Sequence, residues 1–463
     1  MSRVRNPLLL ALIGLRGNAR AATYTEPMWG LSMMLVLPYA SVYMLALGLH
    51  DEQIGLLATV AMLSQMVFGL LGGVITDKYG RRWTTALWDV VAWSIPCLIW
   101  AFAQNFWFFL VASLVNGAWQ VTQNSWDCLL VEDVRPDQLT KVYSLVKVAG
   151  DLSALFAPIA AALVAQFGLV PAVRILYINA FVVMTAKVFI LFHWSTETET
   201  GWKRMEQTRN QSLWSLVAGY RQVIGIALRS RGTVFSLAIM AIVAAAQLVE
   251  GTFWQIIASQ KLLVPDPLLP FFPMLRSVLS IIFFFTVIPR LTGAHHLKRP
   301  TLLGFAVWLV GQVILVAIPA PAGAAGWETF ALLGTSLAFD GFGIAILGML
   351  AESLVALSVD RDERSRVMAL QRTFVMLVTA PFGWIAGWLS GMDRTFPFLL
   401  TGALLALGLV VTGRFYVTTH TDPVTSGVSS CRPCRWPRER RLRPASVTES
   451  CRHTVRPERK TTR

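Results

Sequence analysis

Two carboxylates stand inside long apolar segments of this chain, and they are its first candidates for chemistry. Asp340 lies near the middle of an apolar run over 327–350, and Glu250 lies within a run over 232–258. An ionisable group in hydrocarbon costs several kcal/mol unless it faces a partner or a cavity. Because such a carboxylate can take up and release a proton, both residues are candidates for binding a proton or a substrate. The alternative for Asp340 is a structural hydrogen bond or ion pair between helices.

Several cations also fall within apolar runs. Arg276 and Glu250 lie at similar depths in neighbouring runs, so we expect them to pair. Lys147 and Asp151 are four residues apart, which places them on one helix face where a structural pair can form. Lys187 lies near the end of its run, and we expect its ammonium group to reach the membrane surface.

Polar side chains recur at helical spacing in the run over 106–130 and predict a face turned away from lipid. The run over 232–258 adds Gln247 and Trp254 beside Glu250, so the expected interior path is lined with amides and aromatic rings. Trp119 and Trp254 are the expected aromatic substrate contacts, whereas tryptophans at run ends, such as Trp29, are expected interface anchors. The polar face of the run over 106–130 consists of Asn116, Gln120, Gln123, Asn124 and Asp127.

The composition of the 463 residues describes an integral membrane protein. Hydrophobic residues make up 55% of the chain, charged residues only 14%, and the mean hydropathy is +0.57. The formal net charge is +14, but residues 421–463 hold eleven Lys or Arg against four acids, so half of the excess lies in the tail. This distribution argues against nucleic acid binding and favours a disordered basic tail against anionic lipid.

The cysteines predict neither a disulfide framework nor a metal centre. Two of the five fall inside apolar runs. The others stand in the tail, where the Cys-x-His ending is not a usual zinc-finger spacing and few apolar residues are available to fold around a metal. We therefore expect no bound metal and no cofactor. The cysteines and histidine considered are Cys97, Cys128, Cys431, Cys434, Cys451 and His453.

Twelve apolar runs are long enough to cross a bilayer. The turns after the second, fourth, eighth and tenth runs carry eleven Lys or Arg, whereas the turns on the other side carry three. Because positive residues stay in the cytoplasm, we expect both termini there. The predicted runs are about 26–48, 53–76, 83–103, 106–130, 142–166, 172–193, 232–258, 270–289, 300–319, 327–350, 368–389 and 397–417.

One long polar interruption divides these runs into six and six. The predicted fold is therefore an all-α membrane protein with two six-helix halves, an arrangement suited to alternating access. Ala157-Pro158 in the first half is echoed by Ala380-Pro381 in the second, and each Pro can kink its helix. The predicted segments are a cytoplasmic amphipathic segment 1–25, an N-terminal half 26–193, a cytoplasmic linker 194–231, a C-terminal half 232–417 and a basic disordered cytoplasmic tail 418–463.

The turn between the second and third runs is densely charged and very short. It contains Gly73, Asp77, Lys78, Gly80, Arg81 and Arg82 in the order Gly-x-x-x-Asp-Lys-x-Gly-Arg-Arg. Four charges within six residues cannot remain in hydrocarbon, so the chain must surface here. The simple alternative is a basic turn that only sets topology. The spacing, together with a six-plus-six topology over 26–417, resembles motif A of the major facilitator superfamily.

This resemblance implies a conformational latch. In the family, the motif's Asp braces the first half against a helix of the second half, which assigns that role to Asp77. The motif's Arg reaches an acid at the inner end of helix 4, so Arg81 is expected to contact Asp127 or Glu132. The corresponding turn between helices 8 and 9 has no acidic residue, which predicts a one-sided latch. Helix 5 matches the antiporter signature of exporters only in part, since Ala160 and Ala161 stand where a Gly pair is expected.

The sequence thus predicts a secondary active transporter of a small organic solute in the plasma membrane. We expect proton-coupled efflux of drug-like or metabolite substrates by a monomer embedded in the lipid bilayer. The alternative within transport is a proton-coupled importer of a sugar, nucleoside or peptide. A non-transporting membrane receptor or scaffold is the alternative from another class. The sequence contains no phosphate-binding loop, metal cluster or activated nucleophile that would predict an enzyme.

Overall fold

A computed structural model describes residues 12, 14–135, 138–211, 231–286, 297–358 and 364–415 of the chain. The predicted basic tail lies outside these residues, as do most of residues 1–16 and the part of the predicted linker from 212 to 230. The tail cysteines considered for zinc also lie outside them, as do Arg290 and Arg361, two of the eleven Lys or Arg in the turns predicted to be cytoplasmic. The described part is all-helical.

Helices of the first half follow the predicted runs closely, and most of them begin or end within about three residues of the expected bounds. Glycine at the positive φ of +83° ends α4 at Gly80, which lets α5 start one residue later. The elements are α2 (Gly17–Val36), η1 (Leu37–Tyr39), α3 (Ala40–Ala46), α4 (Asp51–Tyr79), α5 (Arg81–Asp89), η2 (Val90–Ser94), α6 (Ile95–Ala101), α7 (Phe106–Asn116), α8 (Trp119–Val131), α9 (Leu139–Ser153), η3 (Ala154–Phe156), α10 (Ala157–Phe167) and α11 (Leu169–Trp194).

A short helix, α12 (Glu199–Thr208), follows the first half, and the described second half then begins at Arg231. Its helix α19 extends eight residues beyond the predicted run, to Ser358. The elements of the second half are α15 (Arg231–Ile256), η4 (Ile257–Lys261), η5 (Asp266–Leu268), α16 (Phe271–Thr286), α18 (Lys298–Ala317), α19 (Trp327–Ser358), α20 (Arg364–Met392) and α21 (Phe396–Phe415).

The first helix begins nine residues before the run predicted for it. Its early residues are small and buried, including Ala19 and Ala22, and they pack against Trp126 and Leu130 of α8. Small side chains allow this close helix packing although the local sequence is only weakly apolar. Residues 17–25 are therefore helix within the bundle in this structure, where the sequence predicted a separate amphipathic segment.

Eleven described helical segments are long and apolar enough to cross a membrane. The predicted fourth run falls on two shorter helices, α7 and α8, because the chain bends at Gly117. A Cβ built on Gly117 would lie 2.6 Å from Cβ of Ser64, and the Ser64 hydroxyl donates to the Leu114 carbonyl over 2.7 Å. The close approach of α4 and the diverted carbonyl explain why the helix breaks at this point.

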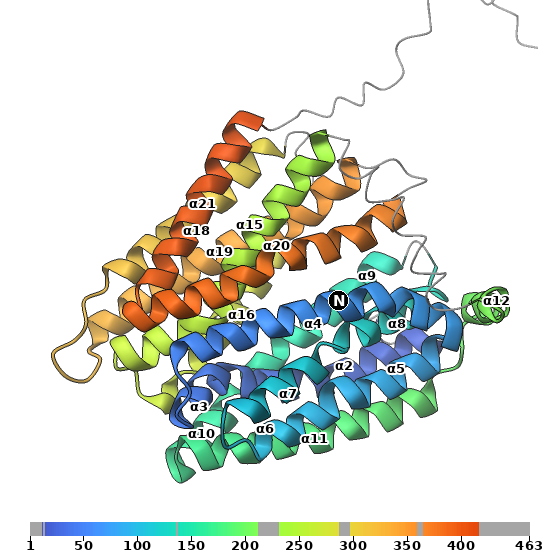
Figure 1. Ribbon diagram of the computed structural model, residues 1–463, viewed down its shortest axis with the longest axis horizontal. Helices are drawn as coiled ribbons and strands as arrows, with labels where there is room; N and C mark the ends of the chain where they lie inside the picture. The colour runs from blue at the N-terminus through green and yellow to red at the C-terminus, as the bar shows by residue number, and fades with distance from the viewer. Residues whose placement is uncertain are drawn as a thin grey trace, which may run out of the picture. The chain divides into compact units, whose positions relative to one another are not determined.

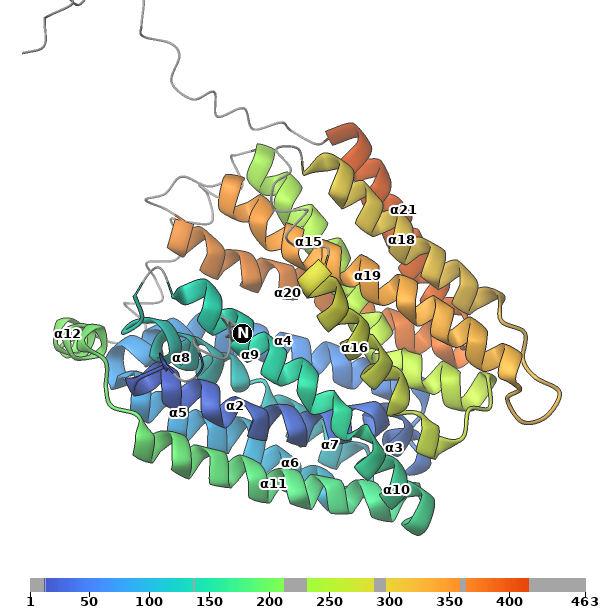
Figure 2. The same cartoon turned by 180° about the vertical axis from the view of Figure 1, so that it is seen from behind.

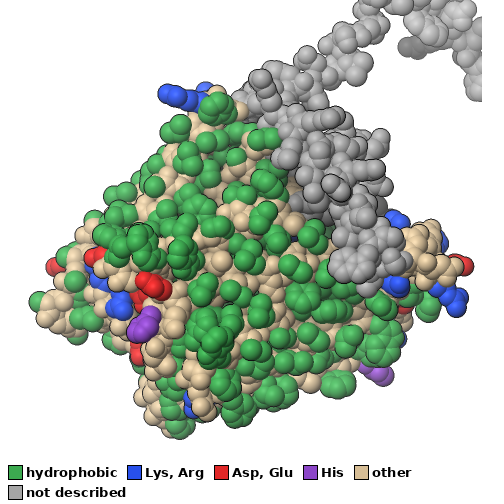
Figure 3. Space-filling view, viewed as in Figure 1, with side chains coloured by type: hydrophobic (Ala, Val, Ile, Leu, Met, Phe, Trp, Pro, Cys, Tyr) green, Lys and Arg blue, Asp and Glu red, His purple; other side chains and the backbone are tan. Residues whose placement is uncertain are grey.

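The bundle has two ends, which we name by their residues. The α12 face carries the Gly80 turn and α12, and the Asp51 face carries the start of α4. Hydrophobic side chains cover the middle of the view in Figure 3, while charged side chains gather toward its ends. This distribution matches a protein whose flanks contact lipid and whose ends contact water.

The two halves meet at the Asp51 face. There, one continuous apolar cluster joins Tyr39 and Ile54 of the first half to Phe253 and Phe398 of the second. The apolar clusters nearer the α12 face each belong to one half. Figures 1 and 2 show the same arrangement, with α4 beside α20 at the Asp51 face and the halves spreading apart toward α12.

Candidate functional site

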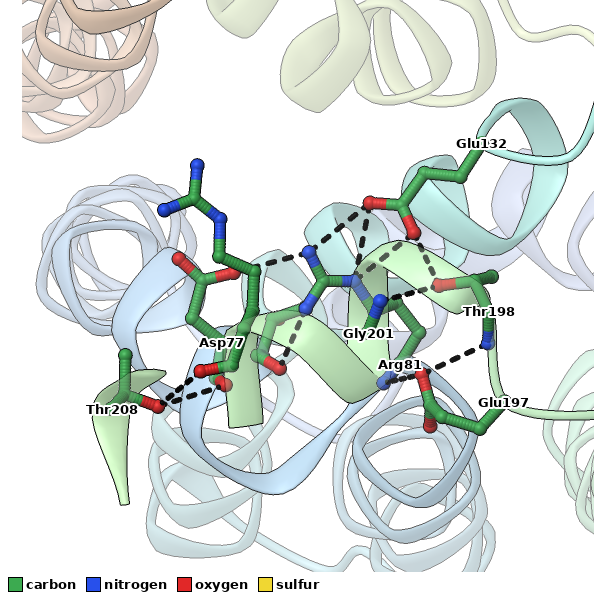
Figure 4. A network of polar contacts seen from close by, with 9 residues as sticks. Asp77, Arg81, Glu132, Glu197, Thr198, Gly201 and Thr208 are labelled. Atoms are coloured by element: carbon green, nitrogen blue, oxygen red, sulfur yellow. Dashed lines mark hydrogen bonds and ion pairs between the residues drawn. The ribbon is translucent and has the colours of Figure 1, made fainter. Parts of the chain in front are cut away.

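The charged turn is organised around the buried guanidinium of Arg81 (Figure 4). Its Nε and Nη2 atoms donate to the Glu132 carboxylate over 3.1–3.2 Å, and Nη2 lies 3.1 Å from Oδ1 of Asp77. The cation thus joins the end of α4 to the end of α8, with 38% of the Asp77 side chain exposed. Of the two acids expected for Arg81, the structure places Glu132 against it, and Asp127 instead accepts from Gln123 over 2.9 Å.

The segment between α11 and α12, together with α12 itself, covers this network. Oε1 of Glu197 accepts from the backbone N–H of Arg81 over 2.9 Å, and Oε2 accepts from that of Arg82 over 3.0 Å. These are the first free N–H groups of α5, so the carboxylate satisfies them and complements the helix dipole. Thr198 donates to Glu132, and the hydroxyl of Thr208 donates to the Asp77 carbonyl over 3.1 Å.

Glycine at position 80 makes this covering possible. A Cβ there would lie 2.6 Å from Oε2 of Glu197 and 2.9 Å from the sulfur of Met205. Arg82 completes the turn, since its guanidinium donates to the Phe192 carbonyl over 2.8 and 3.1 Å and lies 4.0 Å from the Phe192 ring centroid. Lys78 donates to the Gln211 carbonyl over 2.8 Å. The side chains at the start of α20, where the family pattern puts the second partner of Asp77, lie outside the described residues.

A polar contact between the halves closes the Asp51 face. The buried Asp51 carboxylate accepts from the Ser390 hydroxyl over 2.7 Å, and Nε of Arg394 lies 3.5 Å from the same oxygen. Arg394 also donates to Gln260 over 3.4 Å. Lys261 donates to Thr395 over 3.0 Å. The start of α4 is therefore fixed to the end of α20.

Glycines bring α4 and α20 together just beneath this contact. A Cβ on Gly387 would lie 2.8 Å from the Asp51 carbonyl oxygen and 2.9 Å from Cα of Gly55. Next to them, the Thr59 hydroxyl donates to the Ala380 carbonyl over 2.7 Å and accepts from the Trp384 N–H over 2.8 Å. A side chain from α4 thus replaces one intrahelical bond of α20, which makes the two backbones part of one interface.

The second half holds its ionisable residues between α15, α16 and α18. The Glu250 side chain is 2% exposed, and Oε1 accepts from Nη1 of Arg276 over 3.0 Å. Oε2 accepts from the indole N–H of the fully buried Trp308 over 3.0 Å. Since 41% of the Arg276 side chain is exposed, the arginine links a buried acid to an accessible surface.

Asp340 is wholly buried on α19 and is held by neutral donors. The Gln312 amide donates to its Oδ1 over 3.0 Å, and the Ser336 hydroxyl lies 3.4 Å from Oδ2. Ser336 also donates to the Gly311 carbonyl over 3.0 Å. Within the described ranges, no cation lies at ion-pair distance from this carboxylate. Asp340 and Glu250 are close enough for their charges to interact.

Part of the predicted polar face of the fourth run packs against two neighbours, η2 and α4. Asn116 donates to the Ala92 carbonyl over 2.7 Å, and Gln120 and Asn124 lie against Gly72 of α4. Gln123 and Asp127 keep partial exposure, so only part of this face is available to a solute.

The two residues chosen beside Glu250 on α15 have opposite surroundings. Gln247 is exposed, and the Trp254 ring is buried 5.1 Å from the Phe272 centroid within the apolar cluster of the Asp51 face. Trp254 is therefore not accessible in this conformation.

The predicted prolines and lysines take distinct positions. The short turn η3 interrupts the fifth span just before Pro158, whereas α20 runs continuously through Pro381.

Lys147 pairs with Asp151 over 2.7 Å and lies 3.4 Å from Ser280 of the second half. Lys187 is buried and lies 3.3 Å from Asp89, so the expectation that it reaches the membrane surface is wrong.

Several residues of these networks were not singled out by the sequence. Glu197 lies in a polar stretch after the sixth run, where its acidity beside a basic turn is the only available signal. In the sequence, Asp51 is typical of a residue at a helix N-terminus and gives no sign of a further partner. That partner, Ser390, is 339 positions away. Such pairs depend on how the halves pack and leave no local pattern.

Comparisons with known proteins agree with this geometry. The family model for the Major Facilitator Superfamily matches residues 28–339. The quinolone resistance protein NorA of Staphylococcus aureus is 30% identical over 87 residues, which is 19% of this chain and 22% of NorA. The multi-drug resistance efflux pump PmrA of Streptococcus pneumoniae is 28% identical over 109 residues, 23% of this chain and 27% of PmrA. The chain therefore spans only about a quarter of these curated relatives.

Solved structures share the fold over nearly the whole body. A crystal structure of a mutant of the nucleoside transporter NupG has a TM-score of 0.67 at 15% identity, covering 87% of this chain and 100% of that one. The inward open conformation of the xylose transporter XylE from E. coli has a TM-score of 0.64 at 13% identity, covering 87% and 97%. At these identities the likeness concerns the fold.

Proposed function

Because the chain belongs to the Major Facilitator Superfamily, we propose that it is a proton-coupled exporter of small organic molecules that works by alternating access. The observation that carries this proposal is the asymmetry of the interface between its halves. Apolar, polar and glycine-mediated contacts join the halves at the Asp51 face, while the clusters nearer the α12 face belong to single halves. A transporter that opens one side at a time needs such a closed face.

Two sets of contacts would alternate in this cycle. The Asp51 and Gly387 contacts hold the Asp51 face closed in the present conformation. Arg81, Asp77 and Glu132 lie at the opposite face, where a charged network can exchange partners as the halves rock. We propose that Asp77 binds the start of α20 when the α12 face closes, which is the latch role that the family pattern implies.

The buried acids of the second half are the proposed proton sites. Asp340 has neutral donors around it, so a negative charge there would be costly in an apolar span. Glu250 is neutralised by Arg276, and its charge interacts with that of Asp340. Uptake of a proton by this pair would change the charge around Arg276, which is the accessible member, and would thereby couple proton movement to the state of the interface.

The direction of transport is proposed from the curated relatives. NorA is named for quinolone resistance and PmrA for multi-drug efflux, and both match part of this chain. We further propose that the α12 face is cytoplasmic, because the predicted turns on this side carry most of the Lys and Arg. With that orientation the protein would lie in the plasma membrane as a monomer with both termini inside, would need no cofactor and would catalyse no covalent chemistry.

Efflux from inverted membrane vesicles tests this function. Vesicles containing the protein should accumulate a fluorescent drug-like solute when a proton gradient is imposed, and a protonophore should abolish the accumulation. Asp340→Asn and Glu250→Gln should each remove the dependence on the gradient, while downhill movement of the solute should persist. Glu328→Gln is the matched control, since it neutralises an exposed carboxylate at the start of α19, the helix that carries Asp340.

Two outcomes would contradict the proposal. If both acid variants retained gradient-driven accumulation, the proton sites would lie elsewhere. If the vesicles lost solute under the gradient while intact cells gained it, the protein would be an importer.

A further inference from the structure

Two buried aromatic donors at the interface between the halves have no hydrogen-bond acceptor. Tyr39 is 0% exposed and Trp254 is 4% exposed, yet neither the tyrosine hydroxyl nor the indole N–H has a partner among the described residues. The other predicted aromatic contact, Trp119, is partly exposed in the first half, where its ring centroid lies 6.4 Å from that of Trp93. Buried polar groups are nearly always hydrogen-bonded, so the two unmet donors require a physical explanation.

Equally buried residues of the same two types do have acceptors in this bundle. The hydroxyl of Tyr43 donates to the Trp100 carbonyl over 3.0 Å, and the indole N–H of Trp308 donates to Glu250 over 3.0 Å. Both donating residues are 0% exposed. Burial therefore does not by itself leave such donors without acceptors.

The two unmet donors lie on either side of one contact between the halves. The Ser41 hydroxyl of α3 donates to the Thr252 carbonyl of α15 over 2.6 Å. Tyr39 precedes Ser41 by two positions, and Trp254 follows Thr252 by two. Both side chains belong to the apolar cluster that joins the halves at the Asp51 face, where a trapped water would lack the roughly two to four polar partners it needs. The donors therefore stay unmet while α3 and α15 are in contact.

Irregular helix segments adjoin both donors. Tyr39 ends η1, a 3₁₀ turn that interrupts the first span between α2 and α3. Trp254 lies three residues before η4, a π-helical turn over Ile257–Lys261. Interruptions of these kinds within a helix often mark hinges and functional sites. The segments that carry the donors are thus suited to a change of shape when the face opens.

From this arrangement we infer that the closed Asp51 face contains two unmet hydrogen bonds, those of Tyr39 and Trp254, which favour its opening. The inference rests on the proposed alternation of the two faces and concerns how that alternation is regulated. Separation of α3 from α15 gives both donors access to water, so the penalty falls on the closed face only. Each unmet donor shifts the ratio of open to closed face by about 5- to 150-fold. The apolar cluster and the Asp51 contact act in the opposite direction.

Cysteine labelling measures the open fraction of the Asp51 face. Ser41→Cys, in a full-length protein whose five native cysteines are replaced by serine, places a thiol at the contact between α3 and α15. When opening is fast relative to the reaction, the labelling rate with a polar maleimide follows the open fraction, even where that fraction is small. Tyr39→Phe should slow labelling of the purified protein in lipid nanodiscs by at least about fivefold, because it keeps the ring and removes the unmet hydroxyl.

The second donor is tested by an isosteric replacement. Benzothienylalanine in place of Trp254 keeps the fused-ring shape but has no N–H, and it should also slow labelling by at least about fivefold. Tyr43→Phe is the matched control, since it removes a buried hydroxyl that donates to a carbonyl within the first half, and it should not slow labelling. Size-exclusion elution reports folding, and if Tyr39→Phe aggregates, the replacement of Trp254 decides the outcome.

A second reporter separates opening from unfolding. Native Cys97 is 0% exposed on α6, which packs on α7 and α11 of the first half. Its labelling in an otherwise cysteine-free protein therefore requires the first half itself to unfold. Tyr39→Phe should slow labelling more strongly at Ser41→Cys than at Cys97. Equal slowing at both positions would refute the inference, because the hydroxyl would then be unmet within the first half alone.

The inference is also refuted if either folded donor variant is labelled within twofold of the parent rate. Labelling needs neither a solute nor a proton gradient, so the two proposals fail separately. Slower labelling in a protein without gradient-driven efflux would retain the unmet donors and reject the exporter. Gradient-driven efflux with unchanged labelling would retain the exporter and reject the role of the donors.

Discussion

Adding a methyl group at Gly387 should open the Asp51 face. A Cβ there would lie 2.8 Å from the Asp51 carbonyl oxygen and 2.9 Å from Cα of Gly55, and both neighbours are backbone atoms. Ordinary contact begins at 3.4 Å, so α4 and α20 would have to separate by about 0.5 Å. Overpacking of this kind costs about 1–3 kcal/mol.

That cost falls only on the conformation in which the two helices touch. A Gly→Ala change also favours the helix itself, but α20 is expected to remain helical in both conformations, so this contribution cancels. The ratio of open to closed Asp51 face should therefore rise by about 5- to 150-fold. Gly55→Ala should act in the same direction, because a Cβ at Gly55 would lie 2.7 Å from Cα of Gly387.

Pulsed electron–electron double resonance between spin labels at His50 and Asp393 would measure how far the two halves separate at the Asp51 face. Both side chains are exposed at the Asp51 face, one in each half, and the five native cysteines would first be replaced by serine. Gly387→Ala should add a longer distance to the distribution. Gly348→Ala is the control, since a Cβ there meets nothing within 4 Å. An unchanged distribution in a folded Gly387→Ala protein would refute the role assigned to this interface.

Two further predictions concern buried ion pairs and can be measured by thermal unfolding. Glu132→Gln should destabilise the protein by about 3–5 kcal/mol, because it removes the main partner of the buried Arg81. The result expected for Asp77→Asn is a smaller loss, since that carboxylate is 38% exposed, and an equal loss would contradict the assigned geometry. Lys187→Met should likewise cost about 3–5 kcal/mol by leaving Asp89 buried and uncompensated. Adding Asp89→Leu should restore most of that loss, and a double variant as unstable as the single one would show that the pair is not the cause.

The sequence predicted more of the fold than of the site. Span positions followed from apolar length, and the structure moves most boundaries by only a few residues. The exceptions have tertiary causes: α2 starts early because Ala19 and Ala22 pack against α8, and the fourth span bends where Gly117 meets Ser64. Neither contact can be read from hydropathy, because each depends on a neighbour distant in the chain.

The residues of the candidate site show the same division between what the local sequence predicts and what tertiary contacts decide. The charged turn and the intramembrane acids were evident because charge in an apolar run is unusual wherever it folds. Their partners were not: Asp127 and Glu132 are five residues apart on one segment, and only the rotation and depth of α8 bring Glu132 to Arg81. Trp29 was assigned to the membrane interface because its run was expected to begin near Glu26, whereas α2 begins nine residues earlier, at Gly17.

By itself, the sequence determined that this protein crosses a membrane many times and carries a charged turn of the family's type. Both follow from local sequence, because the length of an apolar segment decides whether it can span the bilayer and charged residues are excluded from the hydrocarbon wherever they occur. The tertiary structure decided which charges pair, which buried donors lack acceptors and which face is closed. These outcomes depend on contacts such as those of Asp51 with Ser390 and of Gly55 with Gly387, where chain segments more than 300 residues apart approach to van der Waals distance. No linear pattern of residue types encodes such distances.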